Sequence, residues 1–365
     1  MYIDDLFEDD TNKEEETPNE IPRELRKLRT QPYDKSIIDL IGMIDRNEIC
    51  LDPDFQRNAV WDNKRASLLI ESIWLNIPIP QIFVSIEEDG MWNVIDGRQR
   101  LTSLHRFFKN EFTLRGLEVL PELNGKKYST LEDKPKRLLN GGNIRVVALH
   151  EDSHPDIKFD VFMRINQGAV QLNAQELRNC LYRGRLNSNL HEIVKNPLLL
   201  NILNQEEPHT RFRDIELILR YLALSEGYKT NLDNYPNNMK SFINNYMTKH
   251  RHTDEQGILI INNKIADTLK KVHIVFGNQA FRKWIPETSL FDRKLNLSIM
   301  DCQMLACEKY NIDKLTTNKN KVDSAFKKLY EDQLFISSIS EGTSGKKNIL
   351  LRLEKTLEVF KKILG

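Results

Sequence analysis

The chain has 365 residues, more than one compact core usually contains, so we expect two domains. Hydrophobic residues make up 40% and charged residues 29% of the sequence, an ordinary globular composition, and no apolar run reaches the roughly 18 residues of a membrane span. The formal net charge is zero, and the acidic first ten residues lack the basic segment of a signal peptide, so we expect a cytoplasmic protein.

The first 30 residues are predicted to be an acidic tail and linker. Residues 1–20 contain nine acids and one base, so the rest of the chain carries 52 bases and 44 acids. Because a segment of this composition cannot fold alone, we interpret it as a disordered, solubilising leader. The alternative is that the tail competes with a polyanion for the mildly basic remainder.

Mixed helix and strand signals follow the tail. Apolar residues at helical spacing predict a helix over 36–44, and Asp62 is a predicted N-cap for a second helix over 63–76. Strands are predicted at 81–87 and 91–95, joined in a hairpin by Asp89-Gly90. The remaining elements are a helix that opens at Gly97, a buried strand at 144–149, and helices at 156–165 and 174–183.

These signals predict an α+β chain of two domains after the tail, an α/β domain over 31–185 and an all-α domain over 186–365. Strand signals nearly vanish in the second half. Its amphipathic helices are expected near 213–226, 236–250, 262–276, 296–309, 320–333 and 348–363.

The turn from Asp96 to Arg100 carries the strongest chemical signal. A buried strand there runs into a helix, whose first N–H groups have no partner within the helix and attract negative charge. Gly97 lets a ligand approach the backbone, and the guanidinium groups of Arg98 and Arg100 suit phosphate oxygens. A structural alternative is that Asp96 caps the helix and Gln99 completes a capping box, but this leaves the two arginines unexplained.

Three ordered motifs resemble the N-terminal domain family of GmrSD-type restriction endonucleases. The first is Pro53-x-Phe55-Gln56-Arg57-x-x-Val60-Trp61. The second is Ile79-Pro80 followed by Asp96-Gly97-Arg98-Gln99-Arg100-Leu101, which is similar to the family's DGQQR element. The third runs from Phe162 to Asn179 and contains Arg164, Ile165, Asn166, Gly168, Leu172, Glu176 and Arg178.

The resemblance implies a ParB/sulfiredoxin-like fold and a role in prokaryotic defence. Members of the family are implied to bind and hydrolyse nucleoside triphosphates and to gate the cleavage of modified foreign DNA, often that of phage. The HNH nuclease that commonly follows this domain is not evident downstream. Arg98 stands where the family usually has Gln, which puts in doubt any role in which a neutral amide positions the attacking water.

We therefore predict a site for a nucleoside triphosphate with Mg²⁺. The predicted catalytic residues are Asp96, Arg98, Gln99 and Arg100, and Asp96 is also the predicted metal ligand. The predicted nucleotide-binding residues are Gln56, Arg57, Gly97, Asn166, Glu176 and Arg178. Structural roles stay open for three of these residues: Asp96 as a cap, Asn166 as a C-cap residue, and Glu176 in a capping box with Asn173.

The leading hypothesis is a triphosphate-binding and hydrolysing component of a restriction-type system that acts on DNA, with a separate nuclease subunit as partner and no membrane association. The first alternative is a regulatory or specificity subunit that binds nucleotide or DNA without turnover. The second is a nuclease that uses Asp54, Asp96 and Glu176 as metal ligands.

Other chemistry finds little support in the sequence. No P-loop, GxSxG or HExxH motif is present, and the eight histidines form no metal-like cluster. Because the cysteines at 50, 180, 302 and 307 lack zinc-site spacing, we expect reduced thiols. The helical half carries scattered basic residues, and a solvated surface is the preferred interpretation over phosphate binding; they are Arg282, Lys283, Lys314, Lys319, Lys321, Lys327 and Lys328.

Overall fold

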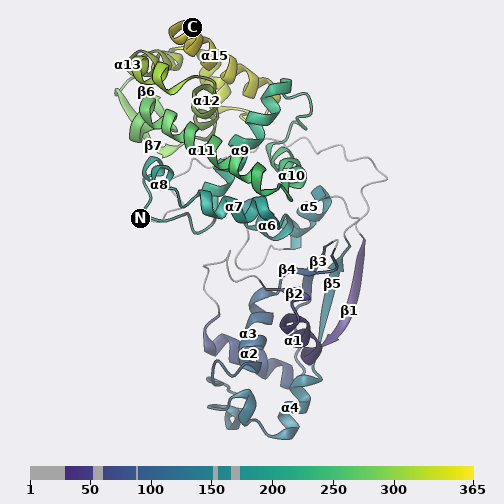
Figure 1. Ribbon diagram of the computed structural model, residues 1–365. Coiled ribbons are helices and arrows are strands. Elements are labelled where there is room, and N and C mark those ends of the chain that lie inside the picture. Colours follow the sequence, from purple (N-terminus) through teal and green to yellow (C-terminus); the bar gives the residue numbers. More distant parts are fainter. Residues whose placement is uncertain (1–28, 52–60, 88, 151–154, 166–172) are drawn as a thin grey trace. The chain divides into compact units, whose positions relative to one another are not determined.

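The computed structural model describes residues 29–51, 61–87, 89–150, 155–165 and 173–365 (Figure 1). Contacts between residues divide the chain into two compact units that meet in sequence at Leu181 and Tyr182, a few residues before the predicted boundary. Each unit has its own core, so we describe them one after the other.

The N-terminal unit is built on a five-stranded mixed sheet. Its strands are β1 (Thr30–Ser36), β2 (Ile49–Cys50), β3 (Ile82–Ile86), β4 (Trp92–Asp96) and β5 (Asn143–Leu149), in the order β1-β5-β3-β4-β2. β4 runs parallel to β2 and antiparallel to β3. The carboxyl ends of β2 and β4 and the amino end of β3 therefore lie together, and we call this part of the sheet the site edge.

Helices cover one side of this sheet. α1 (Ile37–Asp45), α2 (Asn63–Trp74), α3 (Arg98–Phe108) and α4 (Asp133–Asn140) lie together there (Figure 1). Leu40, Ile70 and Leu104, one from each of the first three helices, are fully or almost fully buried in the same core as strand residues Val84 and Val146. Burying these apolar stripes is the main driving force for this packing. α5 (Pro155–Ile165) and α6 (Ala174–Leu181) complete the unit, and α6 contacts β4.

Local sequence signals account for most of these elements. The predicted α1 and α2 are confirmed, and so is the predicted cap of α2, in which Asp62 accepts a hydrogen bond from the Arg65 N–H. Helix α1 is capped by Ser36, which accepts a hydrogen bond from the Asp39 N–H. Strand β1 was not predicted, because its sequence contains Pro32 and no apolar alternation. It pairs with β5 at the margin of the sheet, a position that tolerates proline.

The C-terminal unit is helical, which confirms the predicted fold class. Its helices are α7 (Arg185–Ile193), α8 (Pro197–Leu203), α9 (Arg213–Gly227), α10 (Met239–His250), α11 (Glu255–Phe276), α12 (Leu297–Glu308), α13 (Ile312–Lys328), α14 (Gln333–Ser340) and α15 (Lys346–Leu364). One short hairpin, β6 (Arg282–Ile285) and β7 (Leu290–Leu295), was not predicted. α13 begins before the predicted residue 320 because Asn311 caps it through the Asp313 N–H.

A buried charged triad joins three helices of this unit. Asp301 of α12 accepts two hydrogen bonds from Arg220 of α9, at 2.8 and 2.9 Å, and one from Arg352 of α15, at 2.7 Å. These three residues are at most 3% exposed. Arg352 also donates to the carbonyl oxygens of Ser338 and Thr343. One carboxylate thus accepts hydrogen bonds from two guanidinium groups on different helices.

Two further observations concern the cysteines and the helices. All four cysteines are free, and burial raises the pKa of the Cys302 thiol to about 12. Among the described residues, no helix is both long and apolar enough to cross a membrane.

We predict that Asp301→Asn destabilises the C-terminal unit by about 3–5 kcal/mol, because two guanidinium groups would remain buried without their counter-charge. Urea unfolding followed by circular dichroism measures this free energy. The control is Glu358→Gln on the exposed side of α15, which should change the stability by less than about 0.5 kcal/mol. A similar small change for both variants would show that the triad does not hold the helices together.

Candidate functional site

The turn between β4 and α3 is fixed by a glycine in the left-handed conformation. Gly97 has φ 93° and ψ 5° and occupies the N-cap position of α3, and no side chain caps the helix. A Cβ atom at this position would lie 2.7 Å from Cγ1 of Ile82. Both the backbone conformation and the available space therefore require glycine, and the first N–H groups of α3 are left without an acceptor inside the helix.

The buried side chain of Arg100 stabilises this turn by hydrogen bonds. Its Nη2 donates to Oδ2 of Asp96 at 2.8 Å, and its Nη1 donates to the carbonyl oxygens of Pro80 and Gln81. Arg100 is 8% exposed, whereas the side chain of Asp96 is 40% exposed. The guanidinium thus ties the end of β4 to the residues that precede β3 at the site edge.

The proposed capping box at this helix is wrong. Asp96 does not accept a hydrogen bond from the first turn, because its carboxylate pairs with Arg100. The side-chain oxygen of Gln99 instead accepts the backbone N–H of Trp61 at 3.0 Å. Gln99 therefore joins α3 to a distant part of the chain, the residue that follows segment 52–60.

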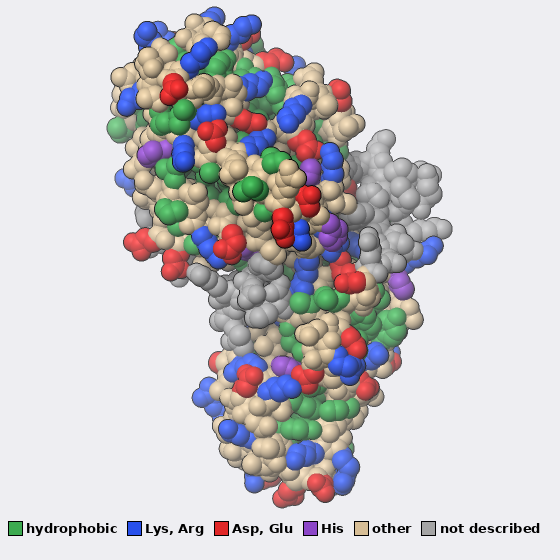
Figure 2. Space-filling model, viewed as in Figure 1, with side chains coloured by type: hydrophobic (Ala, Val, Ile, Leu, Met, Phe, Trp, Pro, Cys, Tyr) green, Lys and Arg blue, Asp and Glu red, His purple; other side chains and the backbone are tan. Residues whose placement is uncertain are grey.

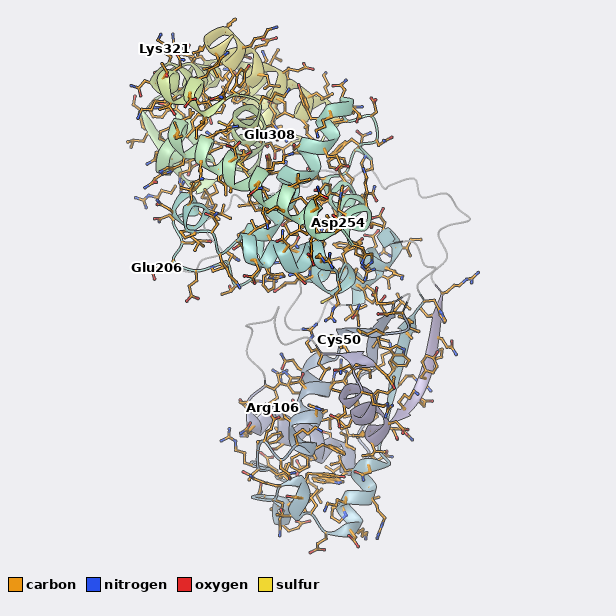
Figure 3. All side chains as sticks on the ribbon, in the orientation of Figure 1. Cys50, Arg106, Glu206, Asp254, Glu308 and Lys321 are labelled. Carbon is orange, nitrogen blue, oxygen red and sulfur yellow. The ribbon has the colours of Figure 1, made fainter. Side chains whose placement is uncertain are left out.

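Trp61 is held at α3 by further contacts. Its carbonyl oxygen accepts a hydrogen bond from Nη1 of Arg106, which also donates to Oδ1 of Asn63 through Nη2. The guanidinium of Arg65 lies 4.3 Å from the centre of a Trp61 ring, a cation–π contact. Figure 3 labels Arg106 on α3. It also labels Cys50, the last residue of β2, whose carboxyl end belongs to the site edge. The described residues on both sides of segment 52–60 therefore lie at the site edge.

Arg98 points toward α6. Its Nη2 lies 3.9 Å from Sγ of Cys180, and its side chain is only half-buried. A thiol is a weaker acceptor than the carboxylate that Arg100 contacts. Of the two arginines of this turn, Arg98 is the one whose side chain is more exposed to solvent.

Helix α6 begins with a capping box and is lined with buried polar side chains. The Asn173 N–H donates to Oε2 of Glu176 at 2.6 Å, and the Glu176 N–H donates to Oδ1 of Asn173 at 2.8 Å. This reciprocal pair is the structural role that the sequence left open for Glu176.

Arg178 and its neighbours form the buried side of α6. Nη1 of Arg178 donates to Oε1 of Gln175 at 3.3 Å, and its guanidinium lies 5.7 Å from the ring centre of Phe159 in α5. Gln175 donates in turn to Oδ1 of Asn179 at 3.0 Å. Within the described ranges, the amide nitrogen of Asn179 is buried without an acceptor. A buried amide without an acceptor is costly, and it marks α6 as a place where a polar ligand would be stabilised.

The predicted site residues fall into three groups. One turn holds Asp96, Gly97, Arg98, Gln99 and Arg100, and Glu176 and Arg178 belong to α6, which Arg98 contacts through Cys180. The residues predicted from the first and third motifs, Gln56, Arg57 and Asn166, lie outside the described residues. In the part of the chain that the structure describes, no three His, Cys, Asp or Glu side chains cluster as a metal site would require.

Sequence reasoning missed the partners that these residues contact. Trp61 stands in the first motif, but nothing in the sequence indicates that its N–H meets Gln99, which lies 38 positions away. Cys180 is 82 positions from Arg98 and directly follows the third motif. The occurrence of the three motifs together in one family was the signal that could have suggested that they meet in the fold.

The comparisons with known proteins give one match. A family model described as the N-terminal domain of the GmrSD restriction endonuclease matches residues 37–183, which include α1 to α6 and the site edge. The searches of curated proteins and of solved structures found no match.

We predict that Gly97→Ala costs clearly more stability than Gly90→Ala. Both glycines have positive φ, 93° and 82°, but only a Cβ at residue 97 meets a neighbour closer than 3 Å. Gly90→Ala should lose about 1–2 kcal/mol from the backbone strain alone, and Gly97→Ala at least about 1 kcal/mol more from crowding. Urea unfolding of both variants measures the difference, and equal losses would contradict the description of the turn.

Proposed function

Because residues 37–183 belong to the GmrSD restriction endonuclease N-terminal domain family, we propose that the chain is the nucleotide-responsive component of a restriction-type defence system that acts on DNA. Its N-terminal unit binds a nucleoside triphosphate at the site edge. The observation that carries this proposal is the turn at Gly97, which presents the amino end of α3 at that edge without a capping side chain.

The polyphosphate is bound by backbone and side chain together. The first N–H groups of α3 and the positive end of its dipole attract phosphate oxygens, and glycine allows them to approach closely. Arg98 adds a guanidinium that is half-buried and lies beside the Cys180 thiol. Because this side chain is partly exposed, its guanidinium can reach a phosphate oxygen at the site edge.

Arg100, Asp96 and Gln99 act mainly by positioning this turn. Arg100 already donates to a carboxylate and to two carbonyl oxygens, so a phosphate contact would require it to give up hydrogen bonds in a buried place. Gln99 is engaged by the N–H of Trp61. In this proposal these residues fix the geometry that Arg98 and the backbone use.

We also assign roles to the remaining predicted residues. Gln56 and Arg57 belong to segment 52–60, whose described neighbours Leu51 and Trp61 are at the site edge, and we propose that they contact the nucleotide. Glu176 and Arg178 shape α6 beside Arg98, and Asn166 precedes this helix in the chain. Their contribution is to orient α6 and its buried amides toward the ligand.

Magnesium fits this arrangement through Asp96. Arg100 contacts Oδ2 of Asp96, yet the side chain is 40% exposed, so the carboxylate can also face an ion. Mg²⁺ commonly takes one or two carboxylates together with phosphate oxygens and water, and it would neutralise phosphate charge here. Asp96 would hold the ion while Arg100 keeps its carboxylate in place.

We predict that Arg98→Ala weakens triphosphate binding by about tenfold or more, because it removes a charge-assisted hydrogen bond to phosphate. Isothermal titration of the four nucleoside triphosphates with Mg²⁺ measures the dissociation constants. The control is Arg137→Ala, which removes an exposed arginine of α4 in the same unit and should bind as the wild type does. A wild type that binds none of the four, or equal affinity of both variants, would end the proposal.

Hydrolysis is tested under the same conditions. Slow release of inorganic phosphate from a saturated wild type, lost in Asp96→Asn, is the outcome we expect. Binding without phosphate release would instead identify a regulatory subunit that senses nucleotide. Metal-dependent nicking of DNA without any triphosphate, abolished in Asp96→Asn, would favour the nuclease.

A further inference from the structure

Helices α13 and α15 form the most basic part of the C-terminal unit. Together they carry eleven lysines and arginines and four acids. Figure 2 shows several Lys and Arg side chains over the region where Figure 1 places these helices. Some of these charged side chains already make hydrogen bonds or ion pairs within the unit, and these must be separated from the rest.

The structure separates the basic residues of the second half into two groups. Arg282 is buried, and its Nη1 donates to the carbonyl oxygens of Ile202, Asn278 and Ala280. Lys327 pairs with Asp323 at 2.7 Å and lies over the rings of Trp284 and Phe291. These two charges are part of the packing and are not available to a partner.

Three other lysines lie on one exposed stripe of α13, which we call the lysine stripe: Lys314, Lys321 and Lys328. A spacing of seven residues returns to within about 20° of the same direction on a helix and advances about 10.5 Å. No ion pair of Lys321 or Lys328 is found in the described part of the chain, and Figure 3 shows Lys321 at the outer surface of α13. Ser324, also exposed, stands between Lys321 and Lys328 in the sequence and can donate to a phosphate oxygen.

The end of α15 extends this stripe. Nζ of Lys314 donates to the carbonyl oxygen of Leu364 at 3.0 Å, so the carboxyl end of α15 lies at the first turn of α13. Lys361 and Lys362 are exposed in that last turn. Asp323 lies between Lys321 and Lys328 in the sequence, and its negative charge is paired with Lys327.

We propose that the lysine stripe, with Lys361 and Lys362, binds the phosphate backbone of duplex DNA. The proposal rests on the function above, a component that acts on DNA, and assigns the contact to this surface. The stripe is about 21 Å long, the rise of about six base pairs, so its three lysines can contact separate phosphates of a duplex. A membrane fits less well, because neither helix exposes a large apolar side chain that could enter the lipid.

The test is the salt dependence of DNA binding. Fluorescence anisotropy with a labelled duplex of about 30 base pairs, between about 50 and 200 mM KCl, gives the slope of log K against log salt. Lys314→Gln, Lys321→Gln and Lys328→Gln combined should reduce this slope by about 3 and weaken binding at least about tenfold, since each phosphate contact releases about one counterion. The control combines Lys126→Gln, Lys127→Gln and Lys134→Gln, exposed lysines of the other unit, and should keep the wild-type slope.

Each result decides the proposal. A wild type that does not bind the duplex, or a stripe variant with unchanged slope and affinity, overturns it. A stripe variant that loses binding to phosphatidylserine vesicles but keeps its DNA affinity also overturns it in favour of a membrane surface. Circular dichroism checks that the variants are folded, and triphosphate titration without DNA tests the nucleotide site separately, so failure of one proposal is distinguishable from failure of the other.

Discussion

The ion pair between Arg100 and Asp96 is the interaction on which the N-terminal unit's chemistry depends. It joins residues four apart across the turn at Gly97, and the same guanidinium holds the carbonyl groups that precede β3. The left-handed glycine sets the conformation of the turn, and this pair adds a contact that keeps β4 and α3 in one orientation. Because the pair is mostly buried on the arginine side, the turn is rigid before any ligand arrives, and a preorganised site loses less entropy on binding.

Two kinds of charge follow from this arrangement. Charges that the fold has already paired fix geometry: Arg100 at the turn, and Arg220 with Arg352 around Asp301 in the second unit. Charges on half-buried or exposed side chains are those we assign to partners: Arg98 at the site edge and the lysine stripe on α13. Burial separates the two kinds, whereas the sequence shows all of them alike as basic residues.

The sequence predicted what depends on neighbours along the chain. The stripe of α1, the Asp62 cap of α2, the β3–β4 hairpin and the strand-to-helix change at Gly97 all arise from residues within one or two turns. The structural alternative that it offered, the Asp96 capping box, is wrong, because the Asp96 carboxylate pairs with Arg100 instead of the first turn of α3. The sequence also missed β1, which pairs with β5 more than a hundred residues away. It identified the site's arginines without distinguishing the buried Arg100 from the half-buried Arg98.

Hydrogen exchange at the amino end of α3 tests the central claim most directly. The backbone amides of Arg98, Gln99 and Arg100 have no acceptor within the helix, so they should exchange rapidly in the free protein. A saturating triphosphate with Mg²⁺ should slow the exchange of a peptide covering residues 97–101, if phosphate oxygens accept these N–H groups. Saturated binding that leaves this peptide unchanged, with protection elsewhere, would contradict the account.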